Sequence, residues 1–454
     1  MDLDAVLLSR IQFGFTLAFH ILFPTLTIGL AGFLVLMHGG WLVTGRETYL
    51  RLYRFWLKIF ALGFGTGVVS GIVLSFEFGM NFSGFTAATA NVIGPLMGYE
   101  VLMAFFLEAS FLPIVLFGWG RVGPRLQFFA TVMVALGTAL SAFWILAANS
   151  WMHTPAGFEL RGGVFHPTDW WSVVFNPSFP YRLAHMLMAS LLATAMLIAG
   201  VSAWHLRRQI HPDLAGRALR LAVVSAAVFA PLQVLLGDLH GLQVHRDQPV
   251  KVAAMEALWQ TREAVPFVLF AWPDQEAATN RYALEIPHAG SLILTHSWNG
   301  RVAGLDAVAP PDRPPVAWVF FGFRIMVGIG LLLVIIAWWG LYLRRRGRLE
   351  RTRAYHVVCQ WASPLGFVAV IAGWVTTETG RQPWVVQGLL RTVNSATALP
   401  TASVASSVAL FLLVYLLLLG AFLAFAYRIA RAGPEHEIPP VVRAVPRTAW
   451  RIER

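Results

Sequence analysis

The sequence contains a single cysteine, Cys359, among 454 residues. One thiol cannot supply a disulfide framework, a multi-cysteine zinc site or an iron–sulfur cluster, so these are excluded. Charged residues are also scarce, at 13% of the chain, whereas 57% is hydrophobic and the mean hydropathy is +0.63. A soluble protein of this length could not bury so much apolar surface. The composition therefore predicts an all-α integral membrane protein that crosses the bilayer many times.

The chain also lacks a basic segment before its first apolar run, because it begins MDLDAVLLSR. Signal peptides carry such a segment, so we expect this first run to be kept as a membrane span. The formal net charge of +11 would suit a nucleic-acid-binding protein, but the basic residues are concentrated in loops between apolar runs. We therefore expect no nucleic acid partner.

Nine apolar runs are long enough to cross a bilayer, which takes about 20 helical residues. The segments that follow the first, third, fifth and seventh runs, together with the C-terminal tail after the ninth, hold 22 of the 34 Lys and Arg residues. The positive-inside rule places these segments in the cytoplasm, with the N-terminus outside and the C-terminus inside. The predicted spans are 12–37, 54–79, 94–118, 127–149, 183–204, 218–238, 317–343, 357–378 and 404–428.

The pattern of spans divides the chain into four regions. Six spans occupy 1–238, a long outside loop occupies 239–316, three spans occupy 317–430, and an irregular cytoplasmic tail occupies 431–454. The loop contains KVAAMEALWQ, which is typical of a short amphipathic helix. Loops of this length are usually functional or disordered.

A few polar residues lie inside the predicted spans, where a charged side chain costs at least a few kcal/mol and needs a partner or a role. Most are expected in the outer half of the membrane. They are His20, Glu77, Glu100, Glu108, His185, Arg324 and Glu378, and the apolar Met326 follows Arg324 by two residues.

Each of these residues has an ordinary explanation when it is taken alone. A histidine on a membrane helix often hydrogen-bonds a neighbouring helix, and Met326 could simply pack. Glu77 could be an interfacial residue at a helix end, Arg381 could reach the lipid head groups, and Trp374 could belong to an aromatic belt. These explanations weaken when all must hold together.

Together the residue types favour haem and proton transfer. A neutral imidazole and a thioether form the axial pair of a six-coordinate, low-spin haem, whereas a carboxylate or a second histidine with nothing opposite leaves an iron position open. Glu100 and Glu108 are eight residues apart, which is about 80° round a regular helix and roughly 12 Å along it. That spacing suits a stepped proton path.

Five motifs carry a resemblance to a known family: FHILFP, GYEVLMAFFLE, KVAAMEALW, FRIMVG and GRQPW. Together, and in this order, they resemble subunit I of the cytochrome bd-type quinol oxidases. The resemblance covers nearly the whole chain and all nine spans. The compact outside loop and the GDLHG motif resemble the short quinol-loop, cyanide-insensitive subgroup.

The resemblance implies three haems and their ligands. His185 and Met326 would be the axial ligands of the low-spin haem b558. His20 and Glu378 would each ligate one haem of the oxygen site, which pairs the high-spin haem b595 with haem d. The resemblance leaves open which of these two residues holds haem d.

It also implies roles for the other polar residues. Glu100 would approach the iron opposite His20 or gate its protons, and Glu108 would continue the proton path toward the cytoplasm. Lys251 and Glu256 match quinol-binding positions, although five helical residues put them about 140° apart. The alternative for this pair is two solvated loop charges.

Two arginines and a tryptophan complete the implied site. Arg324 and Arg381 would bind haem propionates, and Trp374 would lie among the haems. We expect Arg381 to bind a propionate rather than pair with Glu378, and Pro383 to end the helix.

The implied function is oxidation of quinol at the outer face of the bacterial cytoplasmic (inner) membrane, with reduction of O2 to water by cytoplasmic protons and no proton pumping. The implied partners are subunit II and a small single-helix subunit. One alternative is a haem–copper oxidase, which needs more histidines than His20 and His185 within the spans. Another is a secondary transporter, which predicts no haem and often an internal repeat, and no repeat is visible.

Overall fold

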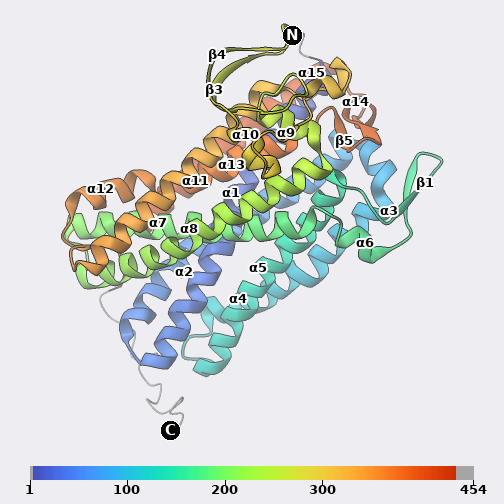
Figure 1. Cartoon of the computed structure of the whole chain (residues 1–454). Coiled ribbons are helices and arrows are strands. Elements are labelled where there is room, and N and C mark those ends of the chain that lie inside the picture. Colours follow the sequence, from blue (N-terminus) through green and yellow to red (C-terminus); the bar gives the residue numbers. More distant parts are fainter. Residues whose placement is uncertain (1–3, 436–454) are drawn as a thin grey trace.

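The computed structural model describes residues 4–435, and in this range nine helical segments are long and apolar enough to cross a membrane. This confirms the predicted all-α membrane fold. Figure 1 shows the long helices packed side by side. They are α1 (Ala5–Thr44), α2 (Glu47–Asn81), α3 (Ser83–Tyr99) continued by η1 (Glu100–Phe105) and α4 (Phe106–Phe117), α5 (Pro124–His153), α7 (Phe179–Arg208), α8 (Pro212–Asp247), α11 (Val316–Arg345), α12 (Arg353–Ala362) continued by α13 (Leu365–Thr379), and α15 (Thr401–Ala432).

Short elements connect these helices at their ends. Three two-stranded antiparallel sheets pair β1 with β2, β3 with β4, and β5 with β6. The bounds are β1 (Phe158–Arg161), β2 (Val164–Pro167), β3 (Phe267–Asp274), β4 (Thr279–Ile286), β5 (Trp384–Val386), β6 (Leu390–Arg391), α6 (Trp170–Val174), α9 (Pro249–Met255), α10 (Ala289–Thr295), α14 (Thr392–Ser395), and the single turns η2 (Leu305–Ala307) and η3 (Pro310–Asp312).

Helix α1 is central, because it packs against α2, α5, α7, α13 and α15. The largest buried apolar cluster joins residues of α1, α2, α7, α8, α11 and α12. By contrast, α15 buries only Val404 and Tyr415 among its described residues. Most of its apolar surface therefore faces outward, as expected for a helix in contact with lipid or another membrane chain.

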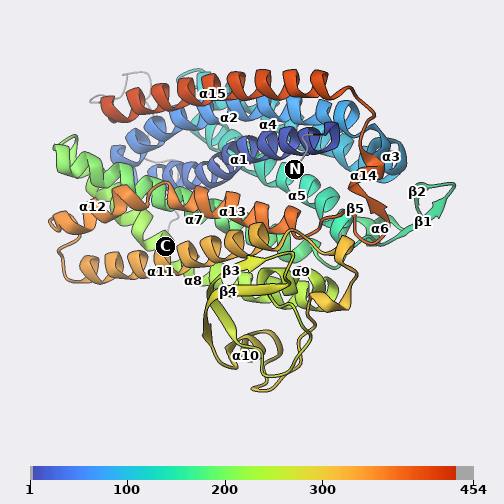
Figure 2. The same cartoon turned by 90° about the horizontal axis from the view of Figure 1, so that it is seen from above.

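The start of α1, the ends of α2 and α5, and the segment 248–315 lie at one end of the helices, which we call the loop end. Figure 2 shows β3, β4 and α10 standing to one side of the helices. At the opposite end, Glu435 pairs with Arg54 and Lys58 of α2. The remainder of the expected cytoplasmic tail, 436–454, lies outside the described residues.

The first part of the expected loop, 239–316, is helical, and its short helix is not amphipathic. Helix α8 continues to Asp247 instead of ending near 238. Helix α9 then buries the run from Lys251 to Met255, because it packs against both α8 and α11. The KVAAMEALWQ segment is therefore an interior element, and the expectation of a solvent-facing side was wrong.

Two spans are interrupted. The eighth breaks between α12 and α13 at Ser363 and Pro364, where proline has no N–H to continue the helix. The third contains a π-helical segment from Glu100 to Phe105, a feature frequently found at functional sites. Both interruptions lie in helices that carry predicted site residues.

Candidate functional site

His20 on α1 points its ring toward α2. Its Nδ1 lies 2.9 Å from the Ser70 hydroxyl oxygen, within hydrogen-bonding distance. A Cβ built on Gly71 would lie 3.0 Å from the ring carbon Cε1. Glycine at this position therefore gives the ring space that any other residue would reduce.

Glu77 lies farther along the same interface and is fully buried. It accepts a hydrogen bond of 2.8 Å from the Thr16 hydroxyl and one of 3.4 Å from the Gln12 amide. These side chains of α1 cover the carboxylate, so Glu77 is enclosed between two helices close to the end of α2.

His185 and Met326 each face a glycine on a neighbouring helix. The Gln233 amide nitrogen lies 3.1 Å from Nε2 of His185, and a Cβ built on Gly237 would lie 3.3 Å from its Cε1. A Cβ built on Gly373 would lie 2.8 Å from the sulfur of Met326. As with His20, each of these two candidate ligands therefore lies beside a glycine of another helix, which has no side chain to occupy the space.

Glu378, near the end of α13, is the centre of a polar network at the loop end. Its Oε2 pairs with Arg381 Nη2 at 2.6 Å. Its Oε1 accepts a hydrogen bond from the Asn149 amide at 3.1 Å and lies 3.3 Å from His153 Nε2 and 3.8 Å from Arg182 Nη2. Arg182 also donates to Asn149. The network holds a carboxylate and two arginines together beneath the loop.

The pairing of Arg381 with Glu378 differs from the expectation that the two would stay apart. Helix α13 ends at Thr379, before Pro383, and Arg381 folds back over the last helical turn. One side of the guanidinium remains available, because Nε and Nη1 have no hydrogen-bond partner among the described residues. Arg381 can therefore hold Glu378 and still donate to another anionic group.

Lys251 of α9 reaches the same network from the loop. Its Nζ lies 2.8 Å from His153 Nδ1 and 2.9 Å from Gln248 Oε1, and the residue is 4% exposed. Burial lowers the pKa of the Lys251 amine well below its ordinary value, and the nearby Arg182 guanidinium lowers it further. Lys251 is therefore not a solvated loop charge.

Glu256, five residues on, pairs with a different element. Its Oε2 lies 2.6 Å from Arg324 Nη2, and the two side chains are 7% and 13% exposed. Arg324 Nε also donates to the Val268 carbonyl at 2.7 Å, while its Nη1 has no hydrogen-bond partner among the described residues. Lys251 and Glu256 thus point to separate partners, in agreement with their predicted angular separation.

Glu100 and Glu108 both face α5. Glu100 accepts a 2.7 Å hydrogen bond from Ser141, and a Cβ built on Gly137 would clash with Cγ of Glu108. Gly137 and Ser141 are one helical turn apart, so the two acids lie along one side of α5. The expected 80° separation assumed a regular helix, whereas the stretch that begins at Glu100 is π-helical and holds about one more residue per turn.

Trp374 is partly buried and packs on an apolar cluster that includes Ile21, Met186 and Val370. Ile21 follows His20 in the chain, and Met186 follows His185. Trp374 therefore packs on a cluster that contains the chain neighbours of two candidate ligands from different helices.

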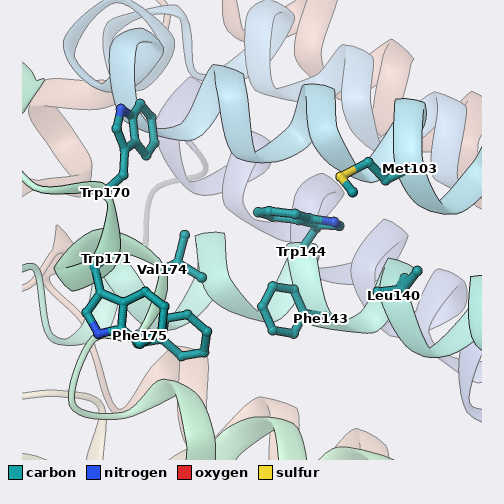
Figure 3. A pocket seen from close by; sticks show the side chains of 8 residues that line it. All are labelled: Met103, Leu140, Phe143, Trp144, Trp170, Trp171, Val174 and Phe175. Carbon is teal, nitrogen blue, oxygen red and sulfur yellow. The ribbon is translucent and has the colours of Figure 1, made fainter.

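An apolar cavity of about 390 Å³ lies near the π-helical segment. Figure 3 shows Phe143 and Trp144 of α5 on one side, and Trp170, Trp171 and Phe175 on another. Its lining contains no titratable side chain, so it contributes no acid or base.

Sequence reasoning missed three members of the Glu378 network: Asn149, His153 and Arg182. The sequence held a signal for one of them, because Arg182 precedes His185 by three residues, about one helical turn. His153 lies just past the predicted end of the fourth span, where a polar residue is ordinary and does not indicate a site. Its role becomes visible only when α5, α9 and α13 are seen together.

Comparison with known proteins identifies the family. The model of the family described as cytochrome bd terminal oxidase subunit I matches residues 8–434. The chain is 34% identical to the cytochrome bd-II ubiquinol oxidase subunit 1 of Escherichia coli (strain K12), a match that covers 95% of this chain and 97% of that protein. It is also 34% identical to the cytochrome bd ubiquinol oxidase subunit 1 of Bacillus subtilis (strain 168), over 96% and 95% of the two chains.

A solved structure agrees with this assignment. The bd oxidase of Geobacillus thermodenitrificans matches with a TM-score of 0.89 and 32% identity, over 95% of this chain and 99% of that one. The haem–copper oxidase and transporter alternatives are thereby set aside. The chain belongs to the cytochrome bd terminal oxidase subunit I family, and it is a multi-pass inner-membrane subunit of a bacterial respiratory quinol:oxygen oxidoreductase.

Proposed function

We propose that this subunit oxidises quinol at the outer membrane face and reduces O2 to water with protons taken from the cytoplasm, which builds a membrane potential without a proton pump. The observation that carries this proposal is the set of buried groups beneath the loop. Glu378, Lys251 and the Arg324–Glu256 pair lie near one end of the helices, together with arginine donors that no described residue uses.

The residues present fit haem. Each of the three candidate ligands His20, His185 and Met326 has a glycine of another helix beside it, where a Cβ would lie 2.8–3.3 Å from the ring or sulfur. Imidazole, thioether and carboxylate are all groups that ligate haem iron or can do so. We assign His185 and Met326 to the low-spin haem b558, and His20 and Glu378 to the oxygen-site haems b595 and d in either order.

Two arginines have the free donors that propionates require. Arg324 Nη1 and the Nε and Nη1 atoms of Arg381 are buried and have no partner among the described residues. A guanidinium can pair with a second carboxylate through such donors. Trp374 would pack beside the haems and exclude water. When bound, the haems would carry electrons from quinol to O2.

Lys251 and Glu256 would bind the quinol. The lowered pKa of Lys251 makes a neutral amine available to accept a proton from a quinol hydroxyl. Glu256 would orient the second hydroxyl while Arg324 holds the carboxylate in place at 2.6 Å. Release of these protons at the loop end would contribute to the membrane potential.

Glu108 and Glu100 would form the proton path from the cytoplasmic side. They share one side of α5, and Ser141 donates to Glu100. The π-helical segment between them brings both carboxyl groups to that side. Glu100 would then deliver protons to the oxygen site, in agreement with its expected place opposite His20.

The topology and partners follow the same reasoning. The basic loops favour an N-terminus outside, which puts the loop end at the outer face. The largely exposed apolar surface of α15 supports contact with lipid or with a membrane partner. We infer subunit II as the main partner, since the relatives are themselves named as subunit 1 of an oxidase, with a small single-helix subunit in addition.

The test is spectroscopic. The purified complex should show three haems by reduced-minus-oxidised spectra and pyridine haemochrome analysis. Glu378→Ala should lose or perturb a high-spin haem and most O2 reduction, while quinol still reduces the low-spin haem. Glu276→Ala removes an exposed loop carboxylate and is the matched control. Full high-spin haem content and unchanged turnover in Glu378→Ala would reject the ligand assignment.

A further inference from the structure

We propose that His153 is a positioning residue that connects the quinol-binding segment to the carboxylate of the oxygen site. It would do so by bridging Lys251 and Glu378 through the two nitrogens of one imidazole ring. The inference rests on the proposed roles of these two residues, and it adds a link between sites that are otherwise assigned to separate steps.

The bridge is built from three different elements. His153 is the last residue of α5 and is 1% exposed. Its Nδ1 lies 2.8 Å from Lys251 Nζ on α9, and its Nε2 lies 3.3 Å from Glu378 Oε1 on α13. No direct hydrogen bond or ion pair joins Lys251 to Glu378 in the described part of the chain. The ring is therefore the shortest hydrogen-bonded link between them.

The contacts determine which ring nitrogen carries the proton. Glu378 also faces Arg381 and Arg182, so it is an ionised acceptor, and the ring must donate to it from Nε2. Nδ1 then has a free lone pair, which accepts from the Lys251 amine, since a lysine amine donates in either of its protonation states. One neutral tautomer satisfies both contacts at once.

The surrounding backbone supports this arrangement. The His153 carbonyl accepts a 3.1 Å hydrogen bond from Gln248, which also accepts from Lys251. A Cβ built on Gly380 would lie 2.9 Å from Cγ of Lys251. The absence of a side chain at Gly380, two residues after Glu378, lets the lysine stem cross the end of α13 and meet the imidazole.

A hydrogen-bonded bridge of this kind transmits a change at one end to the other. Loss of the Lys251 donor frees Nδ1, which alters the strength and direction of the Nε2 hydrogen bond to Glu378. A carboxylate that ligates iron changes its donor strength with such a bond, and the reduction potential of the haem changes with it. His153 would thus make the oxygen site sensitive to the state of the quinol segment.

The test is a double-mutant cycle on the purified holoenzyme complex, read as the midpoint potential of the high-spin haem. With His153 present, Lys251→Met should change the equilibrium constant for one-electron haem reduction about tenfold, which is about 59 mV. In the His153→Leu background the same change should be less than about twofold. Equal shifts in the two backgrounds would overturn the inference, because the coupling would then bypass the ring.

Two further variants separate linkage from simple packing. His153→Gln keeps an acceptor for Lys251 and a donor for Glu378, so it should restore the coupling. His153→Asn is too short to reach both partners and should remain uncoupled; it replaces His153→Leu if that variant fails to assemble. Coupling in His153→Asn equal to that of wild type would also overturn the proposal.

The Glu378→Ala variant distinguishes this inference from the proposed function. If Glu378→Ala keeps its full high-spin haem, the ligand assignment itself is wrong. If it loses that haem while the His153 cycle is additive, only the bridge is wrong. Loss of the haem in Glu378→Ala, together with non-additive midpoint potentials in the His153 cycle, supports both the ligand assignment and the bridge.

Discussion

Replacement of Gly373 by alanine tests whether the Met326 sulfur is an iron ligand. The new Cβ would lie 2.8 Å from the sulfur and 3.7 Å from Cγ of Met326. Non-bonded heavy atoms of this size rest at about 3.5–4.0 Å, so the sulfur must move by about 0.7–1.2 Å. Methionine is unbranched and flexible, so we expect its side chain to rotate while the helices stay in place. Alanine also favours a helix over glycine by about 1 kcal/mol, which protects α13.

A displacement near 1 Å is large for a metal ligand. We expect Gly373→Ala to lose or shift the low-spin haem absorption and to slow quinol oxidation about 10²-fold, at normal levels of assembled complex. Gly328→Ala is the matched control, because Gly328 lies on α11 two residues after Met326 and its Cβ would meet nothing within 4 Å. A wild-type low-spin spectrum in Gly373→Ala would refute the assignment of Met326.

Three further predictions concern the same site. His185→Ala should abolish the low-spin haem signal and quinol oxidation, and an unchanged spectrum would rule His185 out as a ligand. Glu256→Ala should slow quinol oxidation severely while haem content persists, since it removes the carboxylate proposed to orient the quinol, whereas Arg324 keeps its hydrogen bond to the Val268 carbonyl. Glu256→Gln keeps an acceptor and should be milder, and normal turnover in Glu256→Ala would remove Glu256 from the site. Burial lowers the pKa of Lys251, so the neutral amine that accepts a proton is lost as pH falls through that lowered value. The kcat/KM for quinol should therefore fall on the acid side in wild type but not in Lys251→Met, and an acid limb that persists in the variant would assign it to another group.

Local properties of the sequence determined the membrane architecture. A span needs only an apolar run of sufficient length, and the structure places a membrane-length helix over every predicted run, in most cases with longer ends. The family was also readable, because its motifs are short and contiguous, and the match to residues 8–434 confirms it. The candidate residue types, an imidazole at His185 and a thioether at Met326, were visible for the same reason.

Two relations could not be derived from helical periodicity, because one depends on an irregular backbone and the other on a neighbouring helix. The relative position of Glu100 and Glu108 depends on a π-helical segment, and no residue type in that stretch predicts one. The burial of Glu77 depended on Thr16 and Gln12, which pack over it from another helix. Periodicity describes one helix at a time, so it cannot supply either fact.

The partners of the buried charges were decided only by the tertiary structure. Glu256 pairs with Arg324, which is 68 residues away in the chain, and Lys251 hydrogen-bonds His153, which is 98 residues away. Arg381, three residues from Glu378, is a local exception, because side chains three residues apart meet at the end of α13. A buried charge takes the partner that helix packing brings within reach, and the sequence spacing of distant helices carries no record of that packing. The sequence therefore determined which chemical groups enter the membrane, and the packing of α5, α9, α11 and α13 decided which of them meet.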